Sequence, residues 1–275
     1  MMSVGLPVLA FHSIGPGKGP TWFDARAFAV LIDELLEAGF APVNASVIGE
    51  FLAGTNDQGK HVQGKHVHGK HVHGKHDRVS RPVAFTFDDG YQSVLGEALP
   101  ILAARNVTAT VFVVTGAPGR NDWDAPGSFG GGLPLLDRSG IERLVEAGWE
   151  VGSHTHTHKR LRGIAASDVA RELDLANEAL ASIGVTTKTM AYPYGAFDTV
   201  SSNTVREHKM FGFTVGARYA QLGCDTALID RIDACYLKAP LVQHHLGDSV
   251  GASLLAGRQA LRDLRNFTSR RSGNE

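Results

Sequence analysis

Short runs of hydrophobic residues alternate along this chain with segments in which hydrophobic residues recur at helical spacing. Short apolar runs, which predict strands, occur at residues 7–11, 83–87, 108–114, 150–152, 189–192 and 213–216. Helices are predicted between them, most clearly where apolar residues recur at helical spacing, at residues 24–38, 46–52, 95–104, 139–147, 167–183, 200–208 and 249–264. Repeated strand–helix units are typical of an α/β protein with a parallel sheet or barrel, in which active residues lie at the carboxyl ends of strands.

Two of the predicted helices carry end signals. Asp24 is a candidate N-cap residue, and Gly39 follows the last turn of the same helix. Ser139 and Glu142 have the spacing of a capping box, and Gly148 follows that helix. These residues set where we expect the two helices to begin and end.

The composition changes this picture little. The 275 residues are 43% hydrophobic, carry a formal net charge of −1 and contain two cysteines. We expect one soluble domain over residues 1–275 with no disulfide framework, no basic face for nucleic acid and no membrane span. The N-terminal apolar run is short, lacks a basic flank and contains His12, so it is a poor signal peptide and favours a cytoplasmic location.

A histidine-rich repeat interrupts the strand–helix pattern. Residues 59–78 read GKHVQ GKHVH GKHVH GKHDR and include six histidines. A period of five residues is too short for a solenoid unit, and glycine with low complexity predicts a flexible insertion at residues 55–80. The repeat is either a repeat-expanded disordered loop or a cluster of imidazoles that binds metal adventitiously or as a buffer.

Two adjacent carboxylates follow the predicted strand at residues 83–87. The stretch AFTFDDGYQS places Asp88 and Asp89 before Gly90, whose conformational freedom permits a sharp turn. Neighbouring side chains on an extended chain point opposite ways, so one carboxylate could bind a cation while the other faces a reacting water. The alternative is a turn in which an aspartate caps the next helix.

Three histidines follow the predicted strand at residues 150–152, in the stretch SHTHTHKRL. Positions four apart on an extended strand lie roughly 13 Å from each other, too far for two bonds to one metal. His154 and His156 could therefore share a metal on an extended chain, whereas His154 and His158 could share one only across a turn. The strand signal ends at Gly152, which favours the second pair and directs His156 elsewhere.

A third stretch, MAYPYGAFD, follows the predicted strand at residues 189–192. The residue before Pro193 is held extended, and Tyr194 and Gly195 then turn the chain. A backbone N–H exposed at such a turn can face a developing oxyanion. A simple Pro-Tyr-Gly turn without a role in chemistry is the alternative.

Together, these stretches resemble the motifs of the polysaccharide deacetylase family (the NodB-homology domain, carbohydrate esterase family 4). TFDDG at residues 86–90 is unchanged, HTHTH at residues 154–158 matches H-[ST]-x-x-H, and AYPYG at residues 191–195 stands for R-x-P-Y-G. PVLAFHSI and the stretch from NDWDAPGS to the histidines look like one branch of the family, which has an N-terminal active-site histidine. The resemblance spans about residues 6–235 and implies a distorted (β/α) barrel of about seven parallel strands.

The resemblance implies a role for each matching residue. Asp88 would be the general base. A divalent metal ion, most often zinc but also cobalt, nickel or iron, would be bound by Asp89, His154 and His158. Tyr194 would donate its N–H to the oxyanion, and Pro193 and Trp123 would lie on the substrate side.

Two departures from the family pattern matter. Ala191 stands where the third motif has an arginine that orients the base, and we expect Arg231 in DRIDA to replace it. The late Leu-x-His motif is also not clean. His12 in AFHSI has the place of the general acid in the branch named above, and His244 and His245 are the alternatives.

The sequence therefore predicts a metal-dependent deacetylase that hydrolyses the N-acetyl amide of an acetylated amino sugar in a polysaccharide or glycan precursor. Its partner would be a carbohydrate substrate, and its oligomeric state is not predicted. A related hydrolase of a non-peptide C–N bond in a small amide is one alternative. A metal-binding or carbohydrate-binding protein without catalysis, suggested by the histidine repeat and the missing arginine, is the other.

Overall fold

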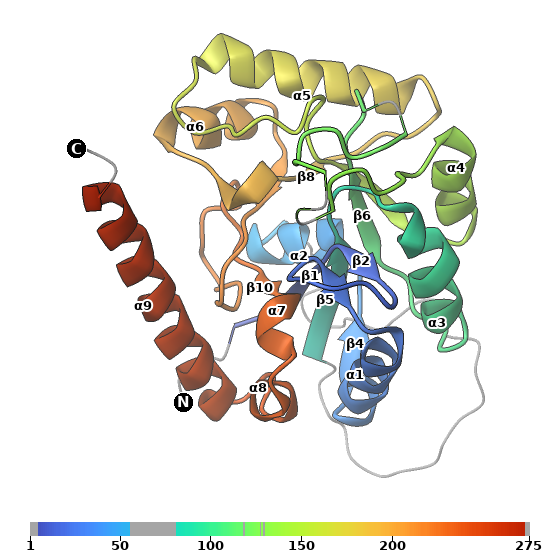
Figure 1. The fold of residues 1–275 in the computed structure, drawn as a ribbon, viewed down its shortest axis with the longest axis vertical. Helices are drawn as coiled ribbons and strands as arrows, with labels where there is room; N and C mark the ends of the chain where they lie inside the picture. The colour runs from blue at the N-terminus through green and yellow to red at the C-terminus, as the bar shows by residue number, and fades with distance from the viewer. Residues whose placement is uncertain (1–4, 56–80, 118, 127, 129, 273–275) are drawn as a thin grey trace.

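A curled parallel sheet with helices around it forms the centre of the computed structural model, which describes residues 5–55, 81–117, 119–126, 128 and 130–272 (Figure 1). Its strands are β1 (Val8–Phe11), β4 (Phe40–Pro42), β5 (Arg81–Phe87), β6 (Thr110–Val113), β7 (Glu150–Ser153), β8 (Thr189–Ala191), β9 (Phe211–Phe213) and β10 (Ile232–Asp233). A separate pair consists of β2 (Ser13–Ile14) and β3 (Trp22–Phe23). The helices are α1 (Ala25–Glu37), α2 (Ala45–Leu52), the π-helix η1 (Val94–Ala98), α3 (Leu99–Ala103), α4 (Arg138–Glu146), α5 (Ala166–Ala181), the 3-10 helix η2 (Pro193–Gly195), α6 (Thr199–Glu207), α7 (Ala234–Leu237), α8 (Pro240–His244) and α9 (Ser249–Ser272).

The main sheet runs in the order β10-β1-β5-β6-β7-β8-β9, and β4 pairs with β5 beside this path. Every pairing in it is parallel. Single bridges from Phe213 to Ile229 and from Gly216 to Ile232 bring the two ends of the path together, so the sheet curls. The predicted α/β fold, a distorted barrel of about seven parallel strands, is confirmed.

The two faces of the strands are buried in different clusters, because successive side chains on a strand point to opposite faces. The inner cluster includes the small residues Ala84 and Ala191, the rings of Phe112 and Phe213, and Ile48 of α2. Helix α2 covers the amino ends of the strands, where its first N–H groups donate to a threonine of β6 and to a glutamate of β7. The carboxyl ends of the strands are therefore the open side of the barrel.

Helix ends agree with the predictions at one helix and differ at another. The carboxylate of Asp24 accepts a hydrogen bond from the N–H of Ala27 at 2.9 Å, which confirms the predicted N-cap of α1. The predicted capping box at Ser139 is wrong. Asp137 caps α4 instead, accepting from the N–H of Gly140 and the hydroxyl of Ser139, each at 2.8 Å. The aspartate lies two residues earlier and takes both donors.

Other boundaries differ for identifiable reasons. The helix predicted at residues 95–104 is divided into η1 and α3, because Pro100 lacks an N–H for the regular ladder. The strand predicted at residues 213–216 is β9, which ends at Phe213. After it, Thr214 and Gly216 donate their N–H groups to the carbonyls of Ile229 and Arg231 instead of continuing the ladder. Helix α9 extends beyond the predicted end at residue 264.

Two further predictions concern other parts of the chain. The predicted insertion at residues 55–80 lies outside the described residues, apart from Thr55. Among the described helices, none combines the length and apolarity that crossing a membrane requires.

Aromatic side chains pack between the outer face of the sheet and the helices. Phe11 of β1 is fully buried, and its ring centroid lies 5.3 Å from that of Phe23, 5.0 Å from that of Phe28 and 5.6 Å from that of Phe87. The ring of Phe87 also stacks on Trp149 at 5.3 Å. These rings bury much apolar area directly beneath the strand ends that carry the polar motifs.

We expect Phe11→Ala to lower the free energy of unfolding by about 3–5 kcal/mol, because it leaves a cavity among three aromatic rings. Denaturant unfolding measures the change. Val30→Ala on the exposed side of α1, at 50% exposure, is the control and should change stability by less than about 0.5 kcal/mol. Equal effects of the two substitutions would contradict this description of the core.

Candidate active site

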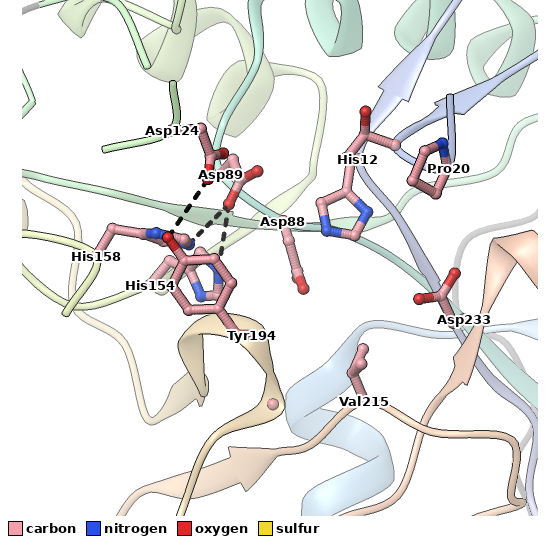
Figure 2. Close-up of a pocket in the computed structure, with 12 residues that line it drawn as sticks. His12, Pro20, Asp88, Asp89, Asp124, His154, His158, Tyr194, Val215 and Asp233 are labelled. Atoms are coloured by element: carbon pink, nitrogen blue, oxygen red, sulfur yellow. Dashed lines mark hydrogen bonds and ion pairs between the residues drawn. The ribbon is translucent and has the colours of Figure 1, made fainter. Parts of the chain in front are cut away.

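A cavity of about 260 Å³ opens at the carboxyl ends of the strands (Figure 2). Each strand of the path except β6 contributes a residue at or just after its end, and these side chains converge on the cavity. They are His12 after β1, Asp88 and Asp89 after β5, His154 and His158 after β7, Tyr194 and Gly195 after β8, Val215 after β9 and Asp233 of β10.

The two adjacent aspartates separate through a turn. The β5 strand ends at Phe87, and Asp89 and Gly90 both have left-handed backbones, with φ of 70° and 75°. The carboxylates are therefore separated by this turn, where the sequence predicted the alternation of an extended chain. Aspartate tolerates the left-handed region better than most residues. At position 90 a Cβ atom would lie 3.0 Å from the side chain of Val113, so glycine suits both the conformation and the space.

Asp89, His154 and His158 converge on one point and are all buried. The Oδ1 atom of Asp89 lies 3.3 Å from Nε2 of His154 and 3.2 Å from Nε2 of His158. The predicted turn between the histidines is present, since Thr155 and His158 have φ of 66° and 58°. His156 faces elsewhere, with its Nδ1 atom 3.0 Å from the hydroxyl of Thr115.

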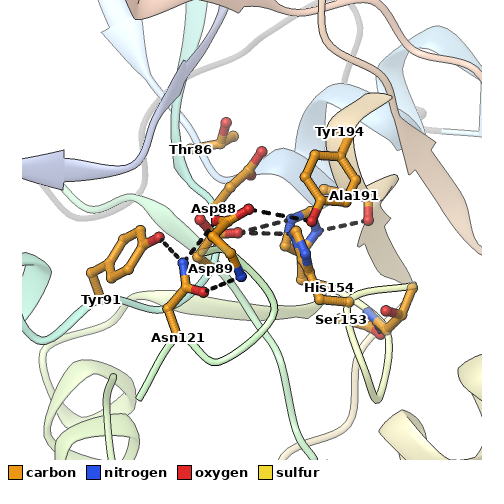
Figure 3. A network of polar contacts seen from close by, with 12 residues as sticks. Thr86, Asp88, Asp89, Tyr91, Asn121, Ser153, His154, Ala191 and Tyr194 are labelled. Atoms are coloured by element: carbon orange, nitrogen blue, oxygen red, sulfur yellow. Dashed lines mark hydrogen bonds and ion pairs between the residues drawn. The ribbon is translucent and has the colours of Figure 1, made fainter. Parts of the chain in front are cut away.

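The donor atoms of this cluster suit a divalent cation. Nδ1 of His154 lies 2.8 Å from the carbonyl oxygen of Ala191 and must donate to it, so the neutral ring turns a lone pair on Nε2 towards Asp89 (Figure 3). Two acceptors that face each other require a cation between them. One carboxylate and two imidazoles form a donor set typical of zinc and similar ions, and the carbonyl partner of His154 is typical of a metal-binding histidine.

In the absence of a metal, protons partly serve the same purpose. Burial would raise the pKa of Asp89, but hydrogen bonds from His154 and His158 hold it well below its usual value. Burial would lower the pKa of His154, but its contacts with Asp89 and the charge of Asp88 raise it. Burial prevails at His158 and lowers its pKa. A metal and a proton therefore compete for Nε2 of His154, which makes metal affinity depend on pH.

The second carboxylate, Asp88, is held by Arg231. Nη1 and Nη2 of the arginine lie 2.7 Å from the two oxygens of Asp88. The guanidinium is fully buried, and it also donates to the carbonyl of Thr214 at 2.7 Å and to the hydroxyl of Thr86 at 3.0 Å. Burial would raise the pKa of Asp88, but the charges of Arg231 and His154 lower it, so the carboxylate is ionised at neutral pH.

His12 and Tyr194 line the cavity on different sides. Figure 2 shows His12 across Asp88 from His154 and His158, with Tyr194 beside those two histidines. Tyr194 has a left-handed backbone, with φ of 58°, and its ring lies 4.6 Å from that of His158 and 4.0 Å from the guanidinium of Arg160. A bulky residue in this conformation is uncommon and is held by its surroundings.

Four residues considered in the sequence do not line the cavity. Trp123 packs against His158 with the two rings tilted and their centroids 4.5 Å apart, and Pro193 is buried in η2. His244 ends α8, and His245 follows it and contacts Asp248 at 2.8 Å. The structure therefore brings His12, and neither of the two late histidines, to Asp88.

Sequence reasoning missed several residues of the cavity wall, and one of them, Asp124, lies in the glycine-rich segment at residues 116–134. Asp124 lines the cavity beside His158, and one of its oxygens lies 3.5 Å from the hydroxyl of Tyr194. The side-chain amide of Asn121 donates to its other oxygen at 2.9 Å. The same amide donates to the hydroxyl of Tyr91 at 2.7 Å (Figure 3). The only sequence signal was a carboxylate in a loop that precedes the histidine motif.

Comparisons with known proteins agree with this geometry. Residues 75–215, just over half of the chain, match the family model described as polysaccharide deacetylase. The poly-beta-1,6-N-acetyl-D-glucosamine N-deacetylase of Staphylococcus epidermidis is 24% identical over 166 residues, which are 55% of this chain and 54% of that protein. The chain thus spans about half the length of this curated relative.

Two solved structures share the fold over most of the chain. IcaB from Ammonifex degensii has a TM-score of 0.65 and 26% identity, covering 83% of this chain and 91% of that one. The Streptococcus pyogenes deacetylase PplD in complex with acetate has a TM-score of 0.66 and 17% identity, covering 84% and 93%. The second likeness is one of fold alone.

Replacing Arg231 with methionine should lower the free energy of unfolding at neutral pH by about 3–5 kcal/mol, because Asp88 is left buried and unpaired. The pKa of Asp88 is lowered in the folded protein, so its stabilising contribution is present above the unfolded value of about 3.9 and is lost as pH falls through the folded value. The difference between variant and wild type should therefore shrink in acid, measured by denaturant unfolding across pH.

The matched control for Arg231→Met is Arg105→Met. Arg105 also makes two contacts with one carboxylate, that of Asp33, but on the surface. Its loss should cost at most about 1 kcal/mol. An Arg231→Met variant that is no less stable than Arg105→Met would show that the buried pair does not stabilise the fold.

Bound divalent metal should survive His156→Ala and be lost in His154→Ala and His158→Ala, since only the last two rings face Asp89. Elemental analysis after equilibration with zinc and removal of weakly held ions measures this. The repeat at residues 59–78 is present in every variant, so differences between variants isolate the buried site. Loss of the metal in His156→Ala alone would overturn the ligand assignment.

Proposed function

The chain belongs to the polysaccharide deacetylase family, and from that premise we propose that it is a metal-dependent deacetylase of the branch with an N-terminal active-site histidine. Its substrate would be the N-acetyl amide of an acetylated amino sugar in a polysaccharide or glycan precursor. The observation that carries the proposal is the buried cluster of Asp89, His154 and His158 beside a second carboxylate, Asp88, that Arg231 keeps ionised.

The three ligands would leave positions open for other oxygen ligands, as catalytic metal sites do. When bound there, a divalent cation, which we propose to be zinc, supplies Lewis-acid activation of an amide carbonyl and of water. The side chains around the cluster then have to bind the sugar, move two protons and support one negative oxygen.

Asp88 is suited to take the first proton. Water attacks the carbonyl carbon of the acetamide, a C–O bond forms, and the proton released from water goes to the Asp88 carboxylate. Arg231 holds that carboxylate in one orientation through both of its oxygens and keeps it charged beforehand. The backbone N–H of Tyr194, in the turn at the cavity wall, is the proposed donor to the oxyanion.

His12 is suited to give the second proton. When the tetrahedral intermediate collapses, the C–N bond breaks and the amine needs a proton from a general acid. His12 lines the cavity across Asp88 from the metal ligands, so a substrate placed between them would have its nitrogen towards His12 (Figure 2). The products are acetate and the free amino sugar.

The substrate class rests on the family and on the relatives. The printed name of the Staphylococcus epidermidis relative specifies a poly-beta-1,6-N-acetyl-D-glucosamine. In this chain Asp124 and Asp233 add carboxylates to the cavity wall, and carboxylates accept hydrogen bonds from sugar hydroxyls. We therefore propose N-acetylglucosamine oligomers as the first substrates to test.

With zinc or cobalt added, the wild-type protein should release acetate from N-acetylglucosamine oligomers, and Asp88→Asn should slow the release by about 10²–10⁴-fold, as expected for loss of a general base. Acetate is measured directly in a coupled assay. The control is Asp33→Asn, which removes an exposed carboxylate and should leave the rate unchanged. Equal release by wild type and Asp88→Asn would contradict the role of Asp88 as general base. No release by wild type from any acetylated amino sugar would contradict the proposed substrate class.

A further inference from the structure

A third buried carboxylate lies beneath the two metal-site histidines and has no role in the steps above. Glu172 of α5 is only 9% exposed. Among the residues that the structure describes, its partners are hydrogen-bond donors and include no cationic side chain. A buried carboxylate is costly unless hydrogen bonds replace its hydration, so its place calls for an explanation.

All three of its donors belong to the segment between His154 and His158. Oε2 of Glu172 accepts from the N–H of His156 at 3.0 Å and from the N–H of Thr157 at 2.8 Å. Oε1 accepts from the hydroxyl of Thr157 at 2.6 Å. One carboxylate thus accepts hydrogen bonds from two successive backbone N–H groups and one hydroxyl of the turn between the two histidines. Successive backbone N–H groups in such a turn form a concave site that binds anions.

The turn needs such support because its backbone is unusual. Thr155 and His158 both have positive φ, which a β-branched residue such as threonine seldom adopts without constraint. Such conformations persist only where the surroundings impose them. On the side away from Glu172, the N–H of Gly116 donates to the carbonyl of His156 at 2.8 Å. A Cβ at Gly116 would lie 2.6 Å from that oxygen, so the segment is held closely from both sides.

The two histidines depend on this turn to different degrees. The ring of His154 is oriented by its own hydrogen bond to the carbonyl of Ala191. Nδ1 of His158 is buried and has no hydrogen-bond partner among the described residues. Packing against Trp123 and Tyr194 and the backbone of the turn must therefore place the His158 ring.

We propose that Glu172 is a positioning residue of the metal site, which sets the distance and direction of His158 relative to His154 by fixing the backbone between them. The inference rests on the proposed function, because it assumes that these histidines bind a cation. Glu172 touches neither the cation nor the substrate, and its effect on affinity passes through the turn. Residues that orient metal ligands in this way typically change affinity by about 10–100-fold when replaced.

The test is zinc affinity, measured by competition with a chromophoric chelator on the full chain. Glu172→Ala should weaken zinc binding by about 10–100-fold. Glu172→Gln should bind close to the wild-type level, because the amide oxygen can accept from both N–H groups while the amide nitrogen donates to the Thr157 hydroxyl. The control is Glu178→Ala, an exposed position on the same helix, which should leave affinity unchanged.

A spectroscopic measurement separates positioning from a general loss of stability. With Co²⁺ in place of zinc, the visible absorption bands should shift in Glu172→Ala and stay as in wild type in Glu172→Gln. If Glu172→Ala does not fold, Glu172→Asp serves instead, since its shorter side chain cannot reach all three donors, and it should also weaken zinc binding. Wild-type affinity in whichever of the two variants folds would overturn the role of Glu172 alone. Absence of a buried zinc site in the wild type would overturn the proposed function as well.

Discussion

The buried ion pair between Asp88 and Arg231 is the interaction on which the open end of the barrel depends. The guanidinium contacts Thr86 of β5, the carbonyl of Thr214 after β9 and both oxygens of Asp88. These contacts connect β5, in the sheet, with the segments that follow β9 and precede β10, the two strands at the ends of the path. A buried pair is weak evidence for stability by itself, because desolvation offsets the attraction between the charges. Here it fixes the direction of the Asp88 carboxylate through both of its oxygens.

Small side chains inside the barrel leave room for the buried arginine, Arg231. Ala84 and Ala191 contribute little volume to the inner cluster, and the guanidinium lies 5.4 Å from the ring of Phe112. At the other end, α2 closes the barrel through hydrogen bonds to Thr110 and Glu150. One end of the strands is therefore sealed by a helix, and the other is organised by charged groups around a cavity.

Much of this could be predicted from the sequence where the information is local. Apolar runs located most of the parallel strands, and reach along the chain showed that His154 and His158 need a turn between them. Contacts between distant segments were beyond that reasoning. The bonds from Glu172 to the turn and the position of Asp124 depend on how α5 and a glycine-rich loop pack. The placement of Trp123 against His158 also depends on tertiary packing, and a single sequence carries no signal for it.

The two hydrogen bonds from Arg231 to Asp88 limit the basic strength of this carboxylate. Both oxygens already accept hydrogen bonds from the guanidinium, and the lowered pKa means that Asp88 binds a proton weakly. A weak base contributes little driving force, so the nucleophile itself has to be acidic before transfer can occur. In return, the carboxylate is already charged well below neutrality. In the proposed reaction the lowered pKa keeps Asp88 in the charged form that accepts a proton, and it lowers the basic strength of the same carboxylate.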